Sequence, residues 1–209
     1  MIITEKEAEA FLETHGFPVS RRFFCSTLNA CEKAARRLRY PVAMKVSSSM
    51  ILHKSDVGGV VLDITGPTGL KRAFQKIRNI KGFEGVMVQE YLMGESLLLG
   101  LKKDATFGHA VAVGSGGIYT EVLKDVSFRV CPLTARDAEE MMEELKIYPV
   151  IKGMRGGRDW RKNVRDIVLK VSKLAETYPM IHELDINPLM LSEKGAIVVD
   201  ARMVVESTL

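Results

Sequence analysis

The residues ELDINPLM (183–190) and GAIVVDAR (195–202) read as two short strands that fold back on each other. Apolar and polar residues alternate at the start of the first stretch, a period of two that is typical of a strand with one buried face. Glu193 and Lys194 between them suit a two-residue turn. We therefore expect an antiparallel hairpin.

This hairpin places Asn187 directly opposite Asp200 on one face. An amide oxygen and a carboxylate are hard ligands that suit Mg²⁺, which usually takes one or two protein carboxylates and completes its shell with water and phosphate oxygens. The alternative is an ordinary polar strand face. The same register sets Asp185 opposite Arg202, where the alternative to a functional carboxylate is a cross-strand ion pair of ~0.2–1 kcal/mol.

The composition bounds the class of protein. The chain has 209 residues, 46% of them apolar, and a formal net charge of +4, which predicts a globular protein with a proper core. Three widely spaced cysteines without a CxxC pair indicate neither a disulfide framework nor a zinc site and fit a reducing cytoplasm. No apolar run approaches the ~18 residues of a membrane span, so we expect neither a membrane anchor nor export. A single tryptophan among the basic residues argues against nucleic-acid binding.

The order of expected elements points to an α+β fold. Helices and strands alternate up to about residue 80, and consecutive strands follow from Gly85, which are expected to pair as antiparallel neighbours. Thr4 with Glu7, and Thr134 with Asp137, form capping boxes that begin two of the helices. The helices are expected at residues 4–16, 27–38, 70–80, 134–146 and 159–177, and the strands at 19–24, 41–46, 60–64, 86–92, 95–103 and 109–114. Two interlocked lobes result, and a cleft between lobes is the natural ligand site.

Lys45 alternates with the apolar residues of its strand and therefore points from the opposite face. A serine-rich loop follows and ends in Gly58 and Gly59. Freed backbone amides and hydroxyls can surround phosphate oxygens while a lysine neutralises them. The alternative is a polar loop beside a lysine whose ammonium reaches solvent.

His53 lies in that loop, next to Lys54 and near Asp56. An imidazole titrates near neutral pH, so it can accept a phosphoryl group or act as acid and base. An ordinary loop histidine is the alternative.

Polar residues and glycines further along the chain suggest a nucleotide site. Gln89 and Glu90 end a strand and Glu95 begins the next, so the strand end can offer backbone groups to a base and an acid to ribose hydroxyls. Gly116 and Gly117 form a second flexible turn. Polar strand ends and tight turns explain these residues equally well.

Four separated segments taken together resemble a known family. They are YPVAMKVSSSMILHKSDVGGVVLDI (40–64), VMVQEYLMGESLLLGLKKDATFGHAVAVGSGGIYTEVLKDVSFRVCPL (86–133), ELDINPL (183–189) and VVDAR (198–202). In this order they resemble the ATP-grasp beta subunit of ADP-forming acetyl-CoA or acyl-CoA synthetases, and more distantly the succinyl-CoA synthetase beta subunit. The resemblance implies the ATP-grasp fold, with residues 18–90 as a lid lobe and residues 1–17 with 91–209 as the main lobe.

The resemblance also implies a role for each candidate residue. Lys45 and the glycine loops would hold the phosphates of ADP or ATP, Glu95 would bind the ribose, and Asn187 with Asp200 would hold Mg²⁺. His53 matches a loop histidine of a phosphohistidine relay, and Asp185 matches the acid that positions phosphohistidine. The implied nucleotide-binding residues are Lys45, Gly58, Gly59, Gln89, Glu90, Tyr91, Leu92, Glu95, Gly116 and Gly117.

The implied reaction converts acetyl-CoA, phosphate and ADP into acetate, CoA and ATP. Nothing in the chain resembles a CoA-binding or ligase domain, so these would come from an alpha subunit, in an assembly of two alpha and two beta subunits. Two other readings stay open: a nucleotide-binding regulatory module without turnover, and a stand-alone ATP-grasp carboxylate ligase.

Overall fold

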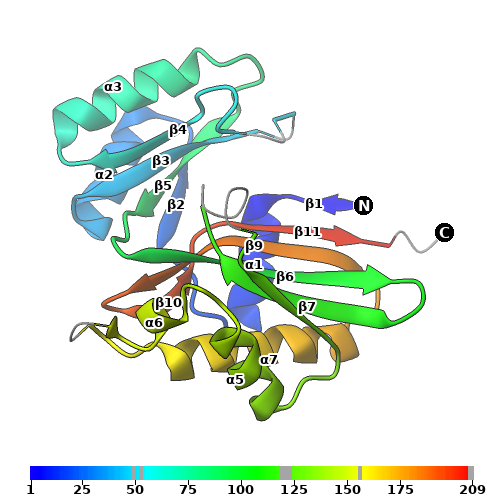
Figure 1. Cartoon of the computed structure of the whole chain (residues 1–209). Helices are drawn as coiled ribbons and strands as arrows, with labels where there is room; N and C mark the ends of the chain where they lie inside the picture. The colour runs from blue at the N-terminus through cyan, green and yellow to red at the C-terminus, as the bar shows by residue number, and fades with distance from the viewer. Residues whose placement is uncertain (49, 52–53, 118–123, 155–156, 207–209) are drawn as a thin grey trace. The chain divides into compact units, whose positions relative to one another are not determined.

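The computed structural model describes residues 1–48, 50–51, 54–117, 124–154 and 157–206 (Figure 1). They form two compact units, a larger one of Met1–Val19 with Met93–Leu209 and a smaller one of Ser20–Leu92. The chain passes between the units twice, after Val19 and after Leu92. Among the described residues, no helix is long and apolar enough to span a membrane.

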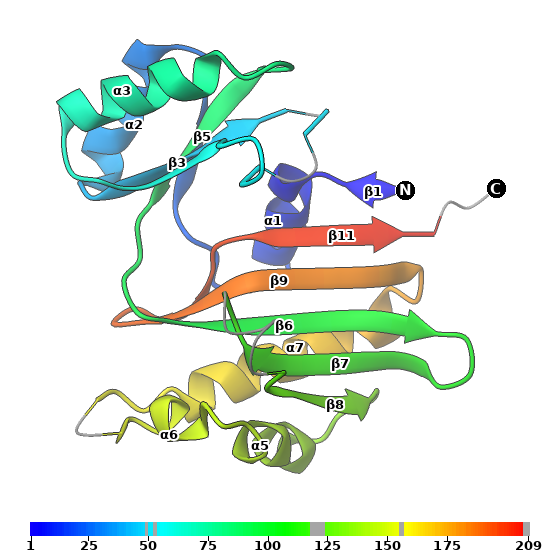
Figure 2. The same ribbon diagram turned by 45° about the horizontal axis from the view of Figure 1, so that its top comes forward.

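The larger unit is built on a seven-stranded antiparallel sheet, whose strands Figure 2 shows side by side. In spatial order the main path of the sheet is β1 (Ile2–Ile3), β11 (Ala201–Val205), β9 (Ile181–Ser192), β6 (Glu95–Asp104), β7 (Gly108–Ser115) and β8 (Val126–Val130). The seventh strand, β10 (Gly195–Val198), also pairs with β9. β6, β7 and β8 pair as antiparallel neighbours, as expected. The expectation is wrong for the first strand of that run, β5 (Gly85–Glu90), which pairs in the sheet of the smaller unit because the chain passes to the larger unit after Leu92.

Helices pack on one face of this sheet (Figure 1). They are α1 (Glu5–Thr14), α5 (Ala135–Glu143), α6 (Tyr148–Ile151) and α7 (Arg161–Thr177). Alternate strand residues such as Leu97, Leu99 and Leu101 are buried against them. The other face carries no helix of this unit within the described ranges, and we refer to it as the open face.

Local sequence signals set several helix ends. Both predicted capping boxes form: Thr4 Oγ1 accepts from the N–H of Glu7, and Thr134 Oγ1 accepts from the N–H of Asp137. Such caps stabilise a helix by ~1 kcal/mol because they satisfy orphan N–H groups. The predicted extension of α5 to residue 146 is wrong, since the chain turns after Glu143 and enters the short helix α6, which the sequence did not reveal.

The smaller unit has a four-stranded antiparallel sheet with two helices packed on one face. Its strands are, in spatial order, β2 (Arg22–Cys25), β5 (Gly85–Glu90), β3 (Val42–Ser47) and β4 (Val60–Ile64), and its helices are α2 (Leu28–Leu38) and α3 (Pro67–Arg78). Val42, Met44 and Val46 point into its apolar core.

Two boundaries differ from the prediction in this part of the chain. The strand expected from residue 19 begins at Arg22, because Val19 forms a parallel bridge with Val198 in the larger unit instead. The helix expected from residue 70 begins at Pro67, whose fixed φ suits the first helical turn.

Candidate functional site

The tail hairpin has the predicted register. Glu193 and Lys194 form the turn, Gly195 pairs with Ser192, and the pairing continues down β10 to Val198 opposite Leu189. β11 resumes on the same edge of β9, with Arg202 opposite Asp185. The register prediction is therefore confirmed.

Asn187 and Asp200 lie where the partner strand changes from β10 to β11. The N–H of Asn187 donates to the carbonyl oxygen of Asp200 at 3.1 Å, and the N–H of Val199 donates to the carbonyl oxygen of Pro188 at 3.1 Å. Leu184, Ile186 and Ala201 alternate into the core, so Asn187 and Asp200 belong to the open face.

This pair suits a hydrated cation. Asn187 is exposed and Asp200 partly exposed, and together they offer one amide and one carboxylate oxygen donor. In the part of the chain that the structure describes, no group of three or more His, Cys, Asp and Glu residues could hold a metal. A two-residue site fits Mg²⁺, which keeps water and phosphate oxygens as its other ligands. The assignment of Mg²⁺ to these two residues stays a prediction.

Asp185 has an unusual environment for a carboxylate. Burial raises its pKa, the charges of Asp200 and Glu183 add to that effect, and Arg202 opposes it. Arg202 lies opposite in the register but forms no ion pair with Asp185 among the contacts of the described residues. Asp185 therefore holds a proton more readily than an ordinary aspartate.

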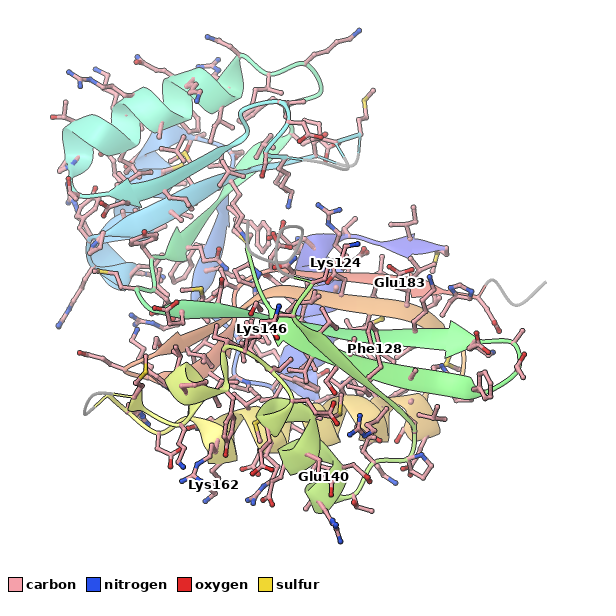
Figure 3. The ribbon with its side chains drawn as sticks, in the orientation of Figure 1. Lys124, Phe128, Glu140, Lys146, Lys162 and Glu183 are labelled. Atoms are coloured by element: carbon pink, nitrogen blue, oxygen red, sulfur yellow. The ribbon has the colours of Figure 1, made fainter. Side chains whose placement is uncertain are left out.

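A hollow of about 320 Å³ adjoins Asp185 on the open face. Gly100, Ala110 and Ala112 line it with small side chains, and Phe128 and Glu183 line it as well. Figure 3 shows Phe128 on β8 and Glu183 on β9. Asp185 can thus be reached from the open face.

Glu95, Gly116 and Gly117 lie together at one end of the same sheet. Glu95 begins β6, and the N–H of Gly116 donates to the carbonyl oxygen of Ser96 at 2.8 Å. A Cβ on Gly116 would lie 2.7 Å from the carbonyl carbon of Leu97, so only glycine fits there. Gly117 adopts a positive φ of 65°.

The pairing of β6 with β9 brings these residues near Asn187 and Asp200, the predicted metal ligands. Glu95 lies opposite Leu191 and Leu97 lies opposite Leu189, one residue beyond Pro188. The sheet of the larger unit therefore gathers its predicted nucleotide-binding and metal-binding residues at one end.

Lys45 and the glycines of its loop lie together in the smaller unit. Lys45 is 5% exposed and lies on the face of β3 opposite the helices, as the alternation predicts. The N–H of Val46 donates to the carbonyl oxygen of Gly59 at 2.7 Å, so the loop returns beside Lys45. A Cβ on Gly59 would lie 2.5 Å from Val46 Cγ1, and Gly58 has a positive φ of 65°. Both glycines are needed for the loop to close.

His53 lies outside the described residues, as do Ser49 and Leu52. Its predicted role stays a prediction.

The end of β5 is held by contacts that the sequence did not reveal. The Gln89 side chain is fully buried, and its Nε2 donates to Ser20 Oγ at 2.5 Å. The Glu90 carboxylate accepts from the N–H of Arg21 at 2.9 Å and from its Nε at 3.3 Å. These side chains join β5 to the start of β2, so contacts with a base would fall to the backbone and to Tyr91 and Leu92.

A second hollow, of about 410 Å³, lies among α5, α6 and α7 and is lined by charged residues. Arg161 is paired with Asp159, and Arg165 with Glu139. Figure 3 shows Lys162 and Glu140 on the helical side of the unit. Because arginine and carboxylate groups neutralise each other here, we read this hollow as a surface ion-pair network.

Comparison with known proteins identifies the family. The model of the ATP-grasp domain matches residues 1–205. The chain is 40% identical to the beta subunit of ADP-forming acetate–CoA ligase I of Pyrococcus furiosus, over 97% of this chain and 91% of that protein. It is 41% identical to ADP-forming acetate–CoA ligase II of Archaeoglobus fulgidus over 98% of this chain, but it spans only 30% of the length of that relative.

Solved structures agree with this result. A structure of the dinucleotide-forming acetyl-coenzyme A synthetase 1 of Ca. Korarchaeum cryptofilum, in complex with coenzyme A, Ca-AMPCP and HgCl⁺, has a TM-score of 0.90 at 34% identity, covering 98% of this chain and 93% of that chain. A structure of PH1788 from Pyrococcus horikoshii has a TM-score of 0.89 at 35% identity, covering 99% of this chain and 92% of that chain. The chain therefore belongs to the ATP-grasp family and, within it, to the beta subunits of ADP-forming acetate–CoA ligases.

Proposed function

We propose that this chain is the nucleotide-binding subunit of an ADP-forming acyl-CoA synthetase, acting in the cytoplasm. With an alpha subunit it would convert acetyl-CoA or a related thioester, phosphate and ADP into the free acid, CoA and ATP. The observation that carries this proposal is the match to a separate beta subunit over nearly the whole length of both chains.

Each unit carries candidate nucleotide-binding residues. Lys45 and the backbone of Gly58, Gly59, Gly116 and Gly117 would neutralise and orient the phosphates, and Glu95 would hold the ribose. Gln89, Glu90, Tyr91 and Leu92 would form the segment beside the base. Such a site accelerates phosphoryl transfer by positioning and charge neutralisation, without covalent chemistry at most of these residues.

Asn187 and Asp200 would hold Mg²⁺ bound to the nucleotide phosphates. When bound, the ion would neutralise charge on the transferred phosphoryl group. The pairing of Asn187 in β9 with Asp200, which lies between β10 and β11, and a related structure in complex with Mg-AMPPCP support this assignment.

His53 would carry or contact the phosphoryl group, and Asp185 would orient the phosphohistidine. The position of Asp185 on the open face, beside a hollow of about 320 Å³, supports a role in contact with a mobile phosphorylated group. In one related structure the phosphohistidine segment points towards the nucleotide-binding site.

The alpha subunit would supply the CoA-binding and ligase domains. The Pyrococcus furiosus relatives are named as beta subunits, and the Archaeoglobus fulgidus relative is more than three times as long as the matching part, which supports a division of this enzyme between chains. We propose an assembly of two alpha and two beta subunits.

The test has two stages. Calorimetry of the isolated chain should detect binding of Mg-ADP, and the isolated chain should form no ATP from acetyl-CoA, ADP and phosphate. Addition of the co-purifying alpha subunit should start ATP formation. If the isolated chain binds no Mg-ADP, the proposed function is wrong. If the chain binds Mg-ADP but the complete complex forms no ATP, the chain is a regulatory nucleotide-binding module instead.

A further inference from the structure

Asp125 closes the base of the segment that contains Gly116 and Gly117. Ser115 Oγ donates to Asp125 Oδ2 at 2.7 Å, and the N–H of Ser115 donates to the carbonyl oxygen of Asp125 at 3.0 Å. Ser115 is the last residue of β7, and Asp125 immediately precedes β8. One side-chain bond and one backbone bond therefore fix the two ends of this segment to each other.

The same carboxylate also binds the turn between α5 and α6. Asp125 Oδ1 accepts from the N–H of Lys146 at 2.7 Å, and Oδ2 accepts from the N–H of Ile147 at 3.1 Å. These contacts explain why α5 stops before residue 146. The Asp125 side chain thus connects the end of β7 with the turn between α5 and α6.

Asp125 is 5% exposed, yet its environment favours the ionised form. Burial by itself would raise the pKa of Asp125, but hydrogen bonds from Ser115, Lys146 and Ile147 outweigh burial, and its pKa is lowered. A buried carboxylate with three donors is a strong anchor, because replacing it leaves those donors unsatisfied.

Gly114, two residues before the turn, packs directly against this anchor. A Cβ on Gly114 would lie 2.5 Å from the carbonyl oxygen of Asp125, and one on Gly116 would lie 2.7 Å from the carbonyl carbon of Leu97. The end of β7 is therefore in close contact with the anchor, and Gly116 of the turn is in close contact with the start of β6, which carries Glu95. A shift of Asp125 would move the turn.

Lys124 provides an independent sign that this junction is constrained. It has a positive φ of 46°, a left-handed conformation that costs a residue with a Cβ about 1 kcal/mol. Such a conformation persists where neighbouring contacts determine the backbone, as the bonds of Asp125 do here.

We propose that Asp125 is a positioning residue for nucleotide phosphates. It would not touch the nucleotide. Its carboxylate would hold the backbone of the Gly116–Gly117 turn where that backbone meets the diphosphate of ADP. The inference rests on the proposed function and names the anchor on which that phosphate contact depends.

The chain offers a matched control at the same junction between β8 and α5. Glu144, beside the end of α5, accepts from Ser127 Oγ at 2.5 Å and from Arg129 NH1 at 3.2 Å. This cluster also joins β8 to α5, but it makes none of the contacts that close the glycine segment. Glu144→Gln therefore weakens the link between strand and helix while sparing the anchor.

The experiment compares Ser115→Ala, Asp125→Asn and Glu144→Gln with the unmodified full-length chain. Calorimetry by competition measures affinity for Mg-ADP and for AMP, and thermal unfolding is followed in parallel. Ser115→Ala removes the side-chain hydrogen bond to Asp125 while keeping the carboxylate, and it remains informative if Asp125→Asn fails to fold. A change at the phosphates alters the ratio of ADP affinity to AMP affinity, whereas general destabilisation does not.

We expect the ratio of ADP affinity to AMP affinity to fall about tenfold in Ser115→Ala and Asp125→Asn and to stay within twofold in Glu144→Gln. An unchanged ratio in Ser115→Ala, in a folded protein, would overturn the proposal for Asp125. If the unmodified chain binds no Mg-ADP, the proposed function fails first, and the two failures are distinguishable.

Discussion

The N–H of Asn187 donates to the carbonyl oxygen of Asp200 at 3.1 Å, although neither β10 nor β11 includes Asp200. The backbone pairing thus continues through the gap between the two strands. Because the pairing is unbroken, two oxygen-bearing side chains stay next to each other on the open face, which is the arrangement that a shared cation requires.

Replacing Asp200 with Asn should reduce the gain in ADP affinity on adding Mg²⁺ by at least about tenfold, because the site loses its carboxylate charge. Calorimetry with and without Mg²⁺ measures this gain. Glu193→Gln, the control, removes an exposed acid from the same hairpin and should leave the gain in ADP affinity on adding Mg²⁺ unchanged. Equal Mg²⁺ dependence in both variants would refute the metal assignment.

Replacing His53 with Asn should abolish ATP formation by the complex with the alpha subunit while Mg-ADP affinity stays within about threefold, since the imidazole takes part in transfer rather than in nucleotide binding. Coupled assays of ATP formation measure the first quantity and calorimetry the second. His182→Asn, at an exposed position of β9, is the control. Full activity in His53→Asn would reduce His53 to a loop residue.

Replacing Gly59 with Ala should destabilise the smaller unit by about 1–3 kcal/mol, because the new Cβ would lie 2.5 Å from Val46 Cγ1 and 2.9 Å from the carbonyl oxygen of Lys54. Urea unfolding measures the free energy.

Gly69→Ala in α3 is the matched control for Gly59→Ala. Its Cβ would make only an ordinary contact, 3.5 Å from Ile64 Cγ2, so the protein should become more stable by about 0.5–1 kcal/mol. A loss of stability of similar size in both variants would show that local packing does not explain the need for Gly59.

Replacing Asp185 with Asn should stabilise the protein at neutral pH while impairing ATP formation by the complex. The pKa of Asp185 is raised in the folded chain, so the folded state binds its proton more tightly than the unfolded state does. Ionisation of Asp185 therefore lowers stability at any pH above its folded pKa, and Asn removes that cost.

The gain in stability of Asp185→Asn should be full above the pKa of Asp185 in the folded chain. It should disappear as the pH falls below the ordinary aspartate pKa of 3.8. Thermal unfolding across this pH range measures it. A gain that does not change with pH would show that burial of the charge is not its cause.

The features that could be predicted depend on residues close in the chain. The hairpin register follows from a two-residue turn and a side-chain period of two, since a slip of one residue would turn Leu184 and Ile186 to the wrong face. The capping boxes of Thr4 and Thr134 span only three residues each.

The features that were missed depend on residues far apart in the chain. α5 ends where it does because Asp125, 21 residues before Lys146, captures its N–H. The Gln89 side chain donates a hydrogen bond to Ser20, 69 residues earlier, and no local pattern reveals this pairing. From the sequence, Asp125 is an ordinary loop residue; only the structure shows that it accepts hydrogen bonds from Ser115, Lys146 and Ile147. Propensity and periodicity carry no information about such pairings.

The chain enters and leaves the smaller unit through two neighbouring strands, β2 and β5. Arg22 lies opposite Gln89, and the N–H of Glu90 donates to the carbonyl oxygen of Arg21 at 3.0 Å. Its two ends therefore lie side by side, which is the geometry of an inserted domain. A gene encoding only this segment should yield an autonomous miniature protein, and a short glycine-rich bridge could replace the segment in the parent chain.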